Sequence, residues 1–362
     1  MLANLRPRPY TGGMASNDHP ALDLFRRLLS VPSPSGREER LAALVVERLE
    51  ELGVSHETDR CGNITVRLRG GDPSLGTVLF AAHMDEIAMV ATGIEPDGRI
   101  RVDRSGGLYP CKIGEGPVEI VGDGEIVPGI LCMGSMHRPD AGSRSVTWPD
   151  AWIETGMDAG ALAMRGVRVG ATAVPSRDRC GPILIGAGDD PLVAAWTFDD
   201  RMGVVALLRL IEAVAARGIE PRHPTLVCFT THEEVGAHGA RVLAARERPE
   251  VFIAIDGCPI PPGSDLALDG RPGIWSKDRT VHFDQTLVRD MCRIAEEAGT
   301  ELQVAVYESA FSDASAALEI GAAQRAATLG QVRENSHGYE VARLSVFDNL
   351  LAVLVRFLEV WS

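Results

Sequence analysis

Residues 77–86 read TVLFAAHMDE, and this stretch decides the fold more than any other. Its first six residues carry no charge, and a histidine and two carboxylates follow within the next four positions. A short apolar run without alternation is typical of a strand buried on both faces, as in the sheet of an α/β protein. In such a sheet, ligands bind just beyond the carboxyl ends of the strands. We therefore expect His83, Asp85 and Glu86 to lie at a functional edge.

Helix and strand patterns alternate on either side of this stretch. Toward the N-terminus, the patterns predict helices over residues 22–29 and 37–52, and a strand over 64–68. Toward the C-terminus, we expect strands at 225–230, 251–255 and 302–307, and helices at 199–218, 240–246, 284–298, 313–320 and 344–361. This alternation predicts an α/β fold with a mostly parallel sheet that is covered by helices on both faces.

The residue pattern of the sequence changes between residues 87 and 187. Glycines and prolines recur, long amphipathic patterns disappear, and short β-rich pieces stand at 118–121, 126–132, 167–173 and 183–185. We expect a small β domain here, inserted into an α/β domain formed by residues 19–86 and 188–362. The alternative is that residues 87–187 form a set of long surface loops and not a separate domain. Residues 1–18 have the composition of a flexible tail.

Composition excludes several classes of protein. A chain of 362 residues exceeds the usual size of a single core, so two domains are expected. The formal net charge of -14 argues against a nucleic-acid partner, which would need clustered basic residues. Seven cysteines without a CxxC pair fit free thiols in a reducing, cytoplasmic compartment. The sequence has neither a signal-peptide pattern nor an apolar run of membrane-spanning length.

Acidic and histidine residues gather where the predicted strands end. Residues 83–86 (HMDE) follow the strand at 77–82, residues 231–234 (THEE) follow 225–230, and residues 256–257 (DG) follow 251–255. The pair Asp199 and Asp200 opens the next predicted helix. Four such clusters at one edge of a sheet need a cation to offset the repulsion between their charges. Mixed histidine and carboxylate ligands suit zinc, cobalt or manganese.

Each cluster taken alone has an ordinary structural explanation. Asp199-Asp200 would cap a helix, and Glu233-Glu234 would be a solvated pair at the start of another. Asp256 would cap a turn, and His337 would be a surface histidine in a loop. Only their joint order along the chain, and their common position at strand ends, favours a metal site.

Five motifs in fixed order carry a resemblance to a known family. They are AHMDEI at 82–87, FDDR at 198–201, EEVGAHG at 233–239, AID at 254–256 and SH at 336–337. In this combination the sequence resembles the glutamyl aminopeptidase family of metallopeptidases, whose members often assemble into tetrahedral (TET) particles. The resemblance covers roughly residues 20–360. It implies a three-layer αβα domain of the zinc-exopeptidase type, with an inserted PDZ-like β domain that serves oligomer contacts.

The resemblance also implies a role for each residue of the site. It assigns five ligands to two divalent ions, with Asp199 shared between them: His83, Asp199, Glu234, Asp256 and His337. Glu233 would be the general base toward a water activated by both ions, and Asp85 would orient His83. The ions would be zinc, with cobalt or manganese as alternatives. In the related fold the peptide bond after Asp199 is often cis.

The function implied is a metal-dependent aminopeptidase that removes N-terminal residues from short peptides. The resemblance also implies a homo-oligomer, from a dimer up to a dodecamer, with peptide substrates and with neither a nucleic-acid nor a membrane partner. Two alternatives stay open: a metal-dependent amidohydrolase, such as a deacylase or carboxypeptidase acting on modified amino acids or small peptides, and a scaffold with purely structural metals. A third, a glycan hydrolase, is disfavoured because these carboxylates stand with other metal-ligand residues and leave no obvious acid and nucleophile pair.

Three segments depart from the family pattern. Residues 309–314 read SAFSDA where members have a sequence like GGTDA, so Phe311 is expected to reshape the substrate pocket. Arg325 stands where an apolar strand is usual, and it would pair with an acidic substrate or lie on an exposed strand face. In residues 332–337 the spacing between Arg333 and His337 differs from that in the family. The assignment of His337 as a ligand is therefore the weakest of the five.

Overall fold

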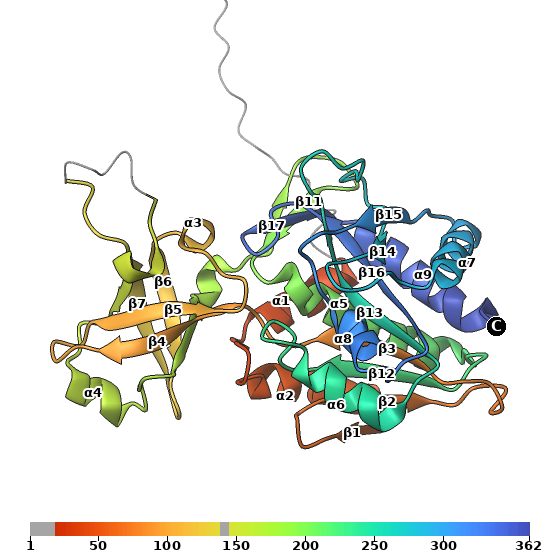
Figure 1. Ribbon diagram of the computed structural model, residues 1–362, viewed down its shortest axis with the longest axis horizontal. Helices are drawn as coiled ribbons and strands as arrows, with labels where there is room; N and C mark the ends of the chain where they lie inside the picture. The colour runs from red at the N-terminus through yellow and green to blue at the C-terminus, as the bar shows by residue number, and fades with distance from the viewer. Residues whose placement is uncertain (1–18, 138–144) are drawn as a thin grey trace, which may run out of the picture.

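An eight-stranded mixed sheet forms the centre of the larger part of the molecule (Figure 1). The computed structural model describes residues 19–137 and 145–362, so the predicted tail at 1–18 lies outside the described residues. In spatial order the strands are β1 (His56–Thr58), β2 (Ile64–Leu68), β12 (Thr225–Thr230), β3 (Val78–His83), β13 (Val251–Pro259), β16 (Arg325–Arg333), β14 (Gly273–Lys277) and β15 (Gln303–Val306).

The four central strands, β12, β3, β13 and β16, run parallel to one another. Antiparallel pairs occur at β1 with β2, β2 with β12, and β14 with β16. Every residue of β3 and β12 is buried, as expected from the apolar residues that fill the middle of both strands. The register places Thr230 beside His83, so both strands end at the same edge of the sheet.

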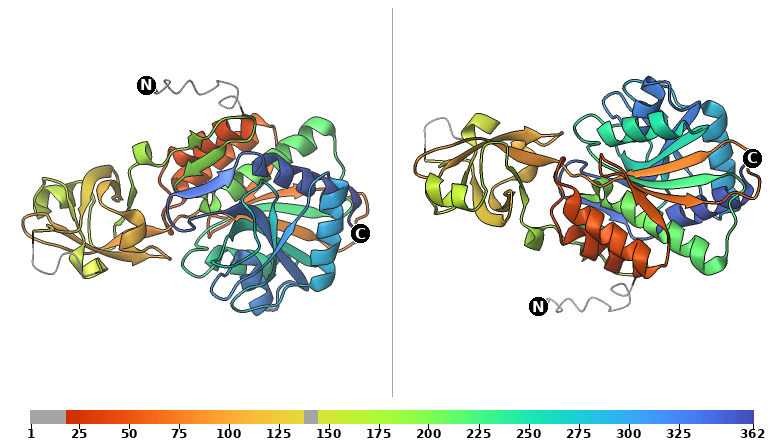
Figure 2. Two further views of the ribbon diagram at one scale, coloured as in Figure 1. Left: turned by 90° about the horizontal axis from the view of Figure 1, so that it is seen from above. Right: turned by 90° about the horizontal axis from the view of Figure 1, so that it is seen from below.

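Helices cover both faces of this sheet, which confirms the predicted α/β layering (Figure 2). One face carries α1 (Pro20–Leu29), α2 (Glu39–Glu51), α5 (Phe198–Arg217), α7 (Gln285–Glu297) and α9 (Val346–Val360). The other face carries α6 (His238–Glu247) and α8 (Asp313–Glu319). Within the described ranges, no helix is both long enough and apolar enough to cross a membrane.

Six further strands close into an antiparallel barrel that stands beside the α/β part (Figure 1). Their order around the barrel is β4 (Ala88–Ile94), β5 (Ile100–Ser105), β8 (Trp152–Glu154), β7 (Ile126–Cys132), β6 (Gly116–Val121) and β9 (Thr172–Pro175). Alternate residues of β7 point into a separate apolar core, which includes Met89, Ile120 and Ile153. The description of this barrel as PDZ-like stays a prediction.

Two of the expected β pieces differ from the structure. Residues 167–171 form a turn after α4 (Ala159–Met164), with Gly170 at a φ of +89°, and β9 begins only at Thr172. The strand expected at 183–185 exists as β10 (Ile183–Ile185) but does not belong to the barrel. It pairs with β11 (Leu192–Ala195), which pairs in turn with β17 (Glu340–Arg343) near the C-terminus. The domain boundaries at 86/87 and 187/188 stay predictions.

A buried ion cluster joins the two parts of the molecule. Glu86, just before the barrel, is fully buried, and its Oε1 lies 3.2 Å from Nη2 of the equally buried Arg201 on α5. Arg177, in the segment that leaves the barrel, lies 3.3 Å from the same oxygen. The main-chain N–H of Ser33 donates to it at 2.8 Å. One carboxylate therefore offsets two guanidinium groups where the chain enters and leaves the barrel.

Replacing Glu86 with alanine should lower the free energy of unfolding by about 3–5 kcal/mol, because two buried arginines lose their counter-charge. The measurement is urea denaturation. The matched control is Glu125→Ala, which removes a carboxylate 2.8 Å from Arg165 in an exposed pair of the barrel and should cost less than about 1 kcal/mol. Equal small losses in both variants would show that the Glu86 cluster contributes no more than a surface pair.

Candidate metal centre

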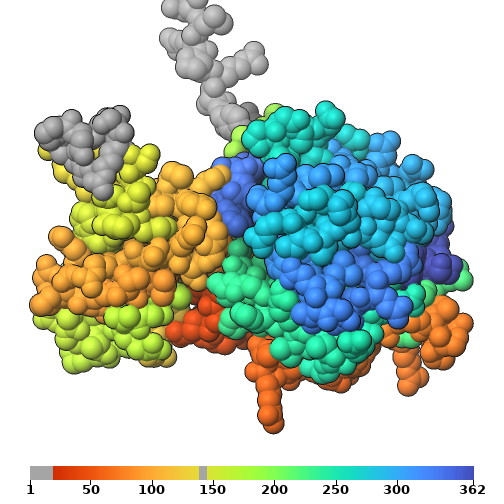
Figure 3. All heavy atoms as spheres, viewed as in Figure 1, coloured from red at the N-terminus to blue at the C-terminus, as the bar shows by residue number. Residues whose placement is uncertain are grey.

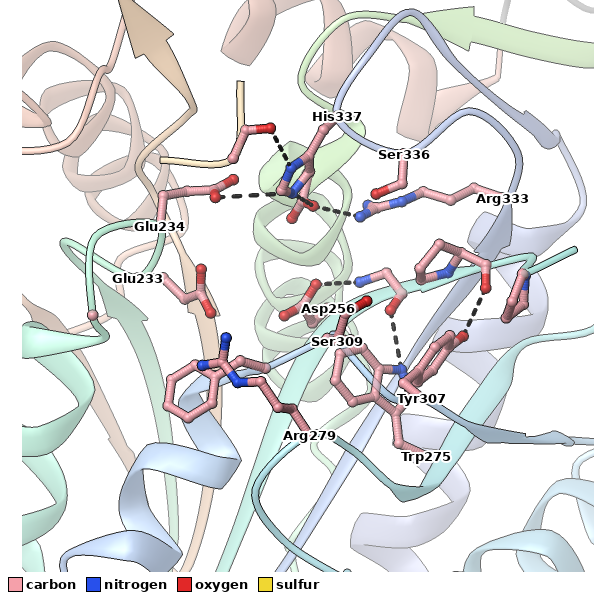
Figure 4. Close-up of a pocket in the computed structure, with 18 of the residues that line it drawn as sticks. Glu233, Glu234, Asp256, Trp275, Arg279, Tyr307, Ser309, Arg333, Ser336 and His337 are labelled. Atoms are coloured by element: carbon pink, nitrogen blue, oxygen red, sulfur yellow. Dashed lines mark hydrogen bonds and ion pairs between the residues drawn. The ribbon is translucent and has the colours of Figure 1, made fainter. Parts of the chain in front are cut away.

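The sequence-predicted ligands converge at the carboxyl edge of the parallel strands. His83 ends β3, Glu234 follows β12, and Asp256 lies in β13. Asp199 lies at the start of α5, and His337 lies in the loop between β16 and β17. In Figure 4, Glu234 and His337 lie in the upper part of the pocket, and Asp256 lies below them. All five predicted ligands therefore meet at one place.

Their side-chain atoms form two overlapping groups that could each hold a metal ion. One group is His83, Asp199 and Asp256, and the other is Asp199, Glu234 and His337. Within each group the ligand atoms lie within 4.8 Å of one another. Asp199 is common to both groups. The arrangement therefore has the form of two adjacent centres that share one carboxylate, as expected for a bridging ligand.

Asp85 organises the site through more contacts than the sequence indicates. Nδ1 of His83 lies 3.1 Å from the main-chain carbonyl of Asp85 and 3.5 Å from its carboxylate. That carboxylate also accepts the main-chain N–H groups of Glu233 at 2.9 Å and Glu234 at 3.1 Å. A third donor is the hydroxyl of Ser35, at 2.6 Å. The carboxylate of Asp85 thus fixes the strand end that carries the adjacent glutamates.

Arg333 and Glu340 are buried partners of Asp199 that sequence reasoning missed. Nη2 of Arg333 lies 2.5 Å from Oδ2 of Asp199, and Nε lies 3.1 Å from Glu340. The main-chain N–H of Asp199 donates to Glu340 at 3.0 Å. A Cβ on Gly257 would lie 2.0 Å from the guanidinium carbon of Arg333, so this glycine makes room for it. The peptide bond between Asp199 and Asp200 is cis.

The carboxyl groups of the centre resist ionisation when no cation accompanies them. Burial raises the pKa of Glu234 to about 8 and that of Asp256 to about 6. Burial also raises the pKa of Glu233 well above its usual range. Among the described residues, the buried Oε1 of Glu234 has no hydrogen-bond partner. This oxygen and the shared, mixed donor set fit divalent cations with oxygen and nitrogen ligands.

The charges around Asp199 lower its pKa, in contrast to the raised pKa values of Glu233, Glu234 and Asp256. Although burial opposes it, the guanidinium of Arg333 and the imidazoles of His337 and His83 hold the pKa of Asp199 well below its usual range. Burial by itself lowers the pKa of His337, but the charges of Glu234 and Asp199 raise it to about 10. Asp199 is therefore an anion at neutral pH, as a bridging ligand must be.

Asp200 and Asp313 are two further buried acids beside the centre. Asp200 accepts the main-chain N–H of His83 at 3.3 Å and that of Gly203 at 2.9 Å, so it ties β3 to α5. Asp313 accepts the hydroxyl of Thr230 at 2.5 Å, and its Oδ1 has no hydrogen-bond partner among the described residues. Burial raises the pKa of Asp313 to about 7.

A cavity of about 710 Å³ opens onto the centre. Phe311 lines it, as expected from the departure at residues 309–314. Arg325 does not: its Nε lies 2.9 Å from Asp284, and its guanidinium lies 5.5 Å from the centre of the Trp361 ring. Arg325 stands at the opposite end of β16 from the site, because it pairs with Val251 where β13 begins. It therefore cannot pair with a substrate in this cavity.

The sequence profile of the M42 glutamyl aminopeptidases matches residues 62–353. This chain belongs to that family. It is 27% identical to the glutamyl aminopeptidase of Lactococcus lactis over segments that cover 66% of each protein. It is also 27% identical to the lysyl aminopeptidase of Pyrococcus furiosus, over 65% of each. The putative aminopeptidase YhfE of Bacillus subtilis is 26% identical over 93% of this chain and 97% of its own length.

Solved structures of similar proteins share the whole architecture. The aminopeptidase APDkam598 of Desulfurococcus kamchatkensis superposes with a TM-score of 0.83 at 26% identity, covering 94% of both chains. The TET1 peptidase of Pyrococcus horikoshii, which can assemble into a tetrahedron or a large octahedral shell, gives 0.81 at 26% identity. It covers 93% of this chain and 99% of its own.

Membership of the M42 family makes the chain a peptide hydrolase of the aminopeptidase type and a metallopeptidase. The resemblance inferred from the five ordered motifs is thereby confirmed.

The raised pKa values predict how the chelated protein responds to pH. In the window from about pH 5 to pH 8, folded Glu234 and Asp313 keep protons that the unfolded chain has released, because unfolded carboxyl groups have pKa values of about 4. The free energy of unfolding should therefore fall as the pH rises, by at least about 1 kcal/mol across the window. Urea denaturation of the chelated protein at several pH values measures this slope.

The variant Glu234→Gln should flatten the slope, because glutamine does not titrate. The control is Glu297→Gln on the surface, since arginine neighbours lower the pKa of Glu297 and keep its titration below the window. A chelated wild type whose stability rises between pH 5 and 8 would contradict this reading of the buried acids.

Proposed function

We propose that this chain is a dinuclear metallo-aminopeptidase that removes N-terminal residues from short peptides. The observation that carries the proposal is the pair of ligand groups that share Asp199 at the floor of the cavity, beside Glu233. His83 and Asp256 would hold one divalent ion, and Glu234 and His337 the other. When bound, such ions polarise the peptide carbonyl and lower the pKa of water, which is the chemistry this site needs.

Glu233 has the position of a general base and acid. It lines the cavity, is 9% exposed, and its Oε2 lies 4.0 Å from Nε2 of His83. Burial raises the pKa of its carboxyl well above the usual range, which makes the carboxylate a stronger base toward a proton of water. Glu233 would remove a proton from the attacking water and return it to the leaving amine. Asp85 would hold the carboxylate in place through the main-chain N–H of Glu233.

The variant Glu233→Gln should lower kcat by about 10²–10⁴-fold, because glutamine keeps the shape but cannot transfer the proton. Zinc content per chain should stay unchanged, because the ligand set is intact. The test combines metal analysis with hydrolysis of aminoacyl p-nitroanilides, and Glu95→Gln on the barrel surface is the control. Full activity in Glu233→Gln would contradict the role of Glu233 as general base, whatever the metal content.

The cavity also supports a preference for acidic N-terminal residues. Arg279 and Arg241 both lie against the face of Phe311, at 5.4 and 6.0 Å from the ring centre. Arg241 is already paired with Glu319 at 2.7 Å, whereas no carboxylate of the described residues forms an ion pair with the exposed Arg279. A substrate carboxylate would supply the missing partner. We therefore propose that Arg279 binds the side chain of an N-terminal glutamate or aspartate.

The variant Arg279→Gln should reduce the preference for glutamyl over leucyl p-nitroanilide by about tenfold or more, since hydrogen bonds to charged groups contribute about 1.5–3 kcal/mol. Activity on the leucyl substrate should change little. The control is Arg289→Gln on the exposed surface of α7. If the ratio of kcat/KM for the glutamyl substrate to that for the leucyl substrate is the same in the wild type and in Arg279→Gln, Arg279 does not bind the acidic side chain of the substrate.

Three further expectations belong to this proposal. The ions would be zinc, with cobalt or manganese as alternatives, because the ligands are histidines and carboxylates. The protein would be a cytoplasmic homo-oligomer, as its free cysteines and its TET-like neighbours support. The barrel would serve oligomer contacts, and it exposes apolar side chains that suit such a role: Ile126, Ile130, Met164 and Val169.

A further inference from the structure

The segment that follows β5 reaches from the barrel to the metal centre, and residues 106–112 are called the barrel loop below. Gly107, Tyr109 and Lys112 of this loop line the cavity. A Cβ on Gly107 would lie 2.3 Å from Nδ1 of His337, and one on Gly106 would lie 3.3 Å from Cβ of Glu234. The two glycines thus allow the main chain of the barrel loop to touch the centre. Figure 3 shows the barrel packed directly against the α/β part.

His337 needs support from outside its own loop. Its side chain is 33% exposed, against 3% for His83 and 12% for Asp199. It lies between two strands, not on one, with a φ of 57°, and Asn335 nearby has a φ of 63°. The left-handed region is unfavourable for residues other than glycine, so this turn persists only where its neighbours hold it.

The main-chain carbonyl of Gly107 orients the imidazole of His337. Nδ1 of the ring lies 3.1 Å from this oxygen (Figure 4). Because a carbonyl only accepts hydrogen bonds, Nδ1 must carry the hydrogen. Nε2 then faces the centre, 3.5 Å from Oδ2 of Asp199, and its lone pair becomes available to an ion when the imidazolium loses the proton at this nitrogen.

Lys112 holds the turn that carries His337. Its ammonium donates to Oδ1 of Asn335 at 2.7 Å, and Nδ2 of Asn335 donates to the carbonyl of Tyr339 at 2.7 Å. The amide of Asn335 therefore connects the barrel loop to both sides of His337 in the chain. Lys112 is one of only two lysines in a sequence rich in arginine.

We propose that Lys112 is a positioning residue for His337, acting through Asn335, so that the inserted barrel sets how tightly the His337 side of the centre binds its ion. The inference rests on the dinuclear site of the proposed function. Charge alone predicts the opposite effect, because an ammonium group near a cation site repels the cation. Removing Lys112 should therefore strengthen metal binding if only its charge matters, and weaken it if its contact matters.

The test is titration of the full-length, chelated protein with Zn²⁺ in competition with a chromophoric chelator. The wild type should bind two ions. Lys112→Met should weaken one of them by about 10–100-fold, the usual effect of losing a partner that orients a ligand, and leave the other unchanged. Lys112→Arg, which keeps a cationic donor, should restore most of the lost affinity.

Two further variants separate the contact from general damage to the barrel. Asn335→Gly removes the amide and relieves the strain of a positive φ, yet it should weaken the same ion as Lys112→Met does. The double variant should lose no more affinity than Asn335→Gly alone, because that variant already removes the contact with Lys112 along with the one to Tyr339. Arg165→Met takes a cation from the exposed surface of the same barrel and should leave both ions unaffected.

A second readout does not depend on metal. In the chelated protein, deuterium uptake of the peptide covering residues 334–341 should rise several-fold in Lys112→Met and Asn335→Gly, but not in Arg165→Met. If the wild type binds two ions and Lys112→Met binds both as tightly or more tightly, the proposal is overturned. If the wild type binds fewer than two ions, the proposed dinuclear site is wrong, and the metal titration does not decide the role of Lys112. Unchanged deuterium uptake in Lys112→Met then overturns the role of Lys112.

Discussion

Repulsion among buried carboxylates is the constraint on which the rest of this structure depends. Glu233, Glu234 and Asp256 lie at one edge of the sheet, where burial raises the pKa of each. A protein gains nothing in stability from such a cluster, since every charge brought out of water costs free energy. Arg333 contacts Asp199 and Glu340 and its charge also favours ionised Asp256, yet burial still raises the pKa of Asp256 to about 6. Divalent cations held among the remaining acids would offset their charge, as the metallopeptidase family of this chain implies.

The sheet supplies the precision that this centre needs. Hydrogen bonds between β3, β12 and β13 fix where His83, Glu234 and Asp256 emerge, because a parallel register leaves little freedom along the strand. Asp85 and Asp200 then tie neighbouring segments to that edge through main-chain N–H groups. The predicted ligands His83, Glu234 and Asp256 are thus held by the strand register and by carboxylate contacts to main-chain N–H groups.

Much of this arrangement is predictable from sequence, because apolar runs end where the strands end. The strands expected at 225–230 and 126–132 occur with those bounds, and all five predicted ligands meet. Closure of the barrel is not predictable, since β9 pairs with strands that lie far from it in the sequence. The same holds for the contacts of Arg333 and Lys112, because side-chain pairs between distant segments leave no periodic signal.

His337 differs from the other ligands because no regular element fixes its position. A residue in a turn between β16 and β17 follows whatever holds that turn, and here the contacts come from Gly107 and Lys112 of the barrel. If a separate part of the molecule orients the imidazole, the turn can differ in length while Nε2 still faces Asp199. The inserted barrel then belongs to the active site as much as to any assembly of subunits.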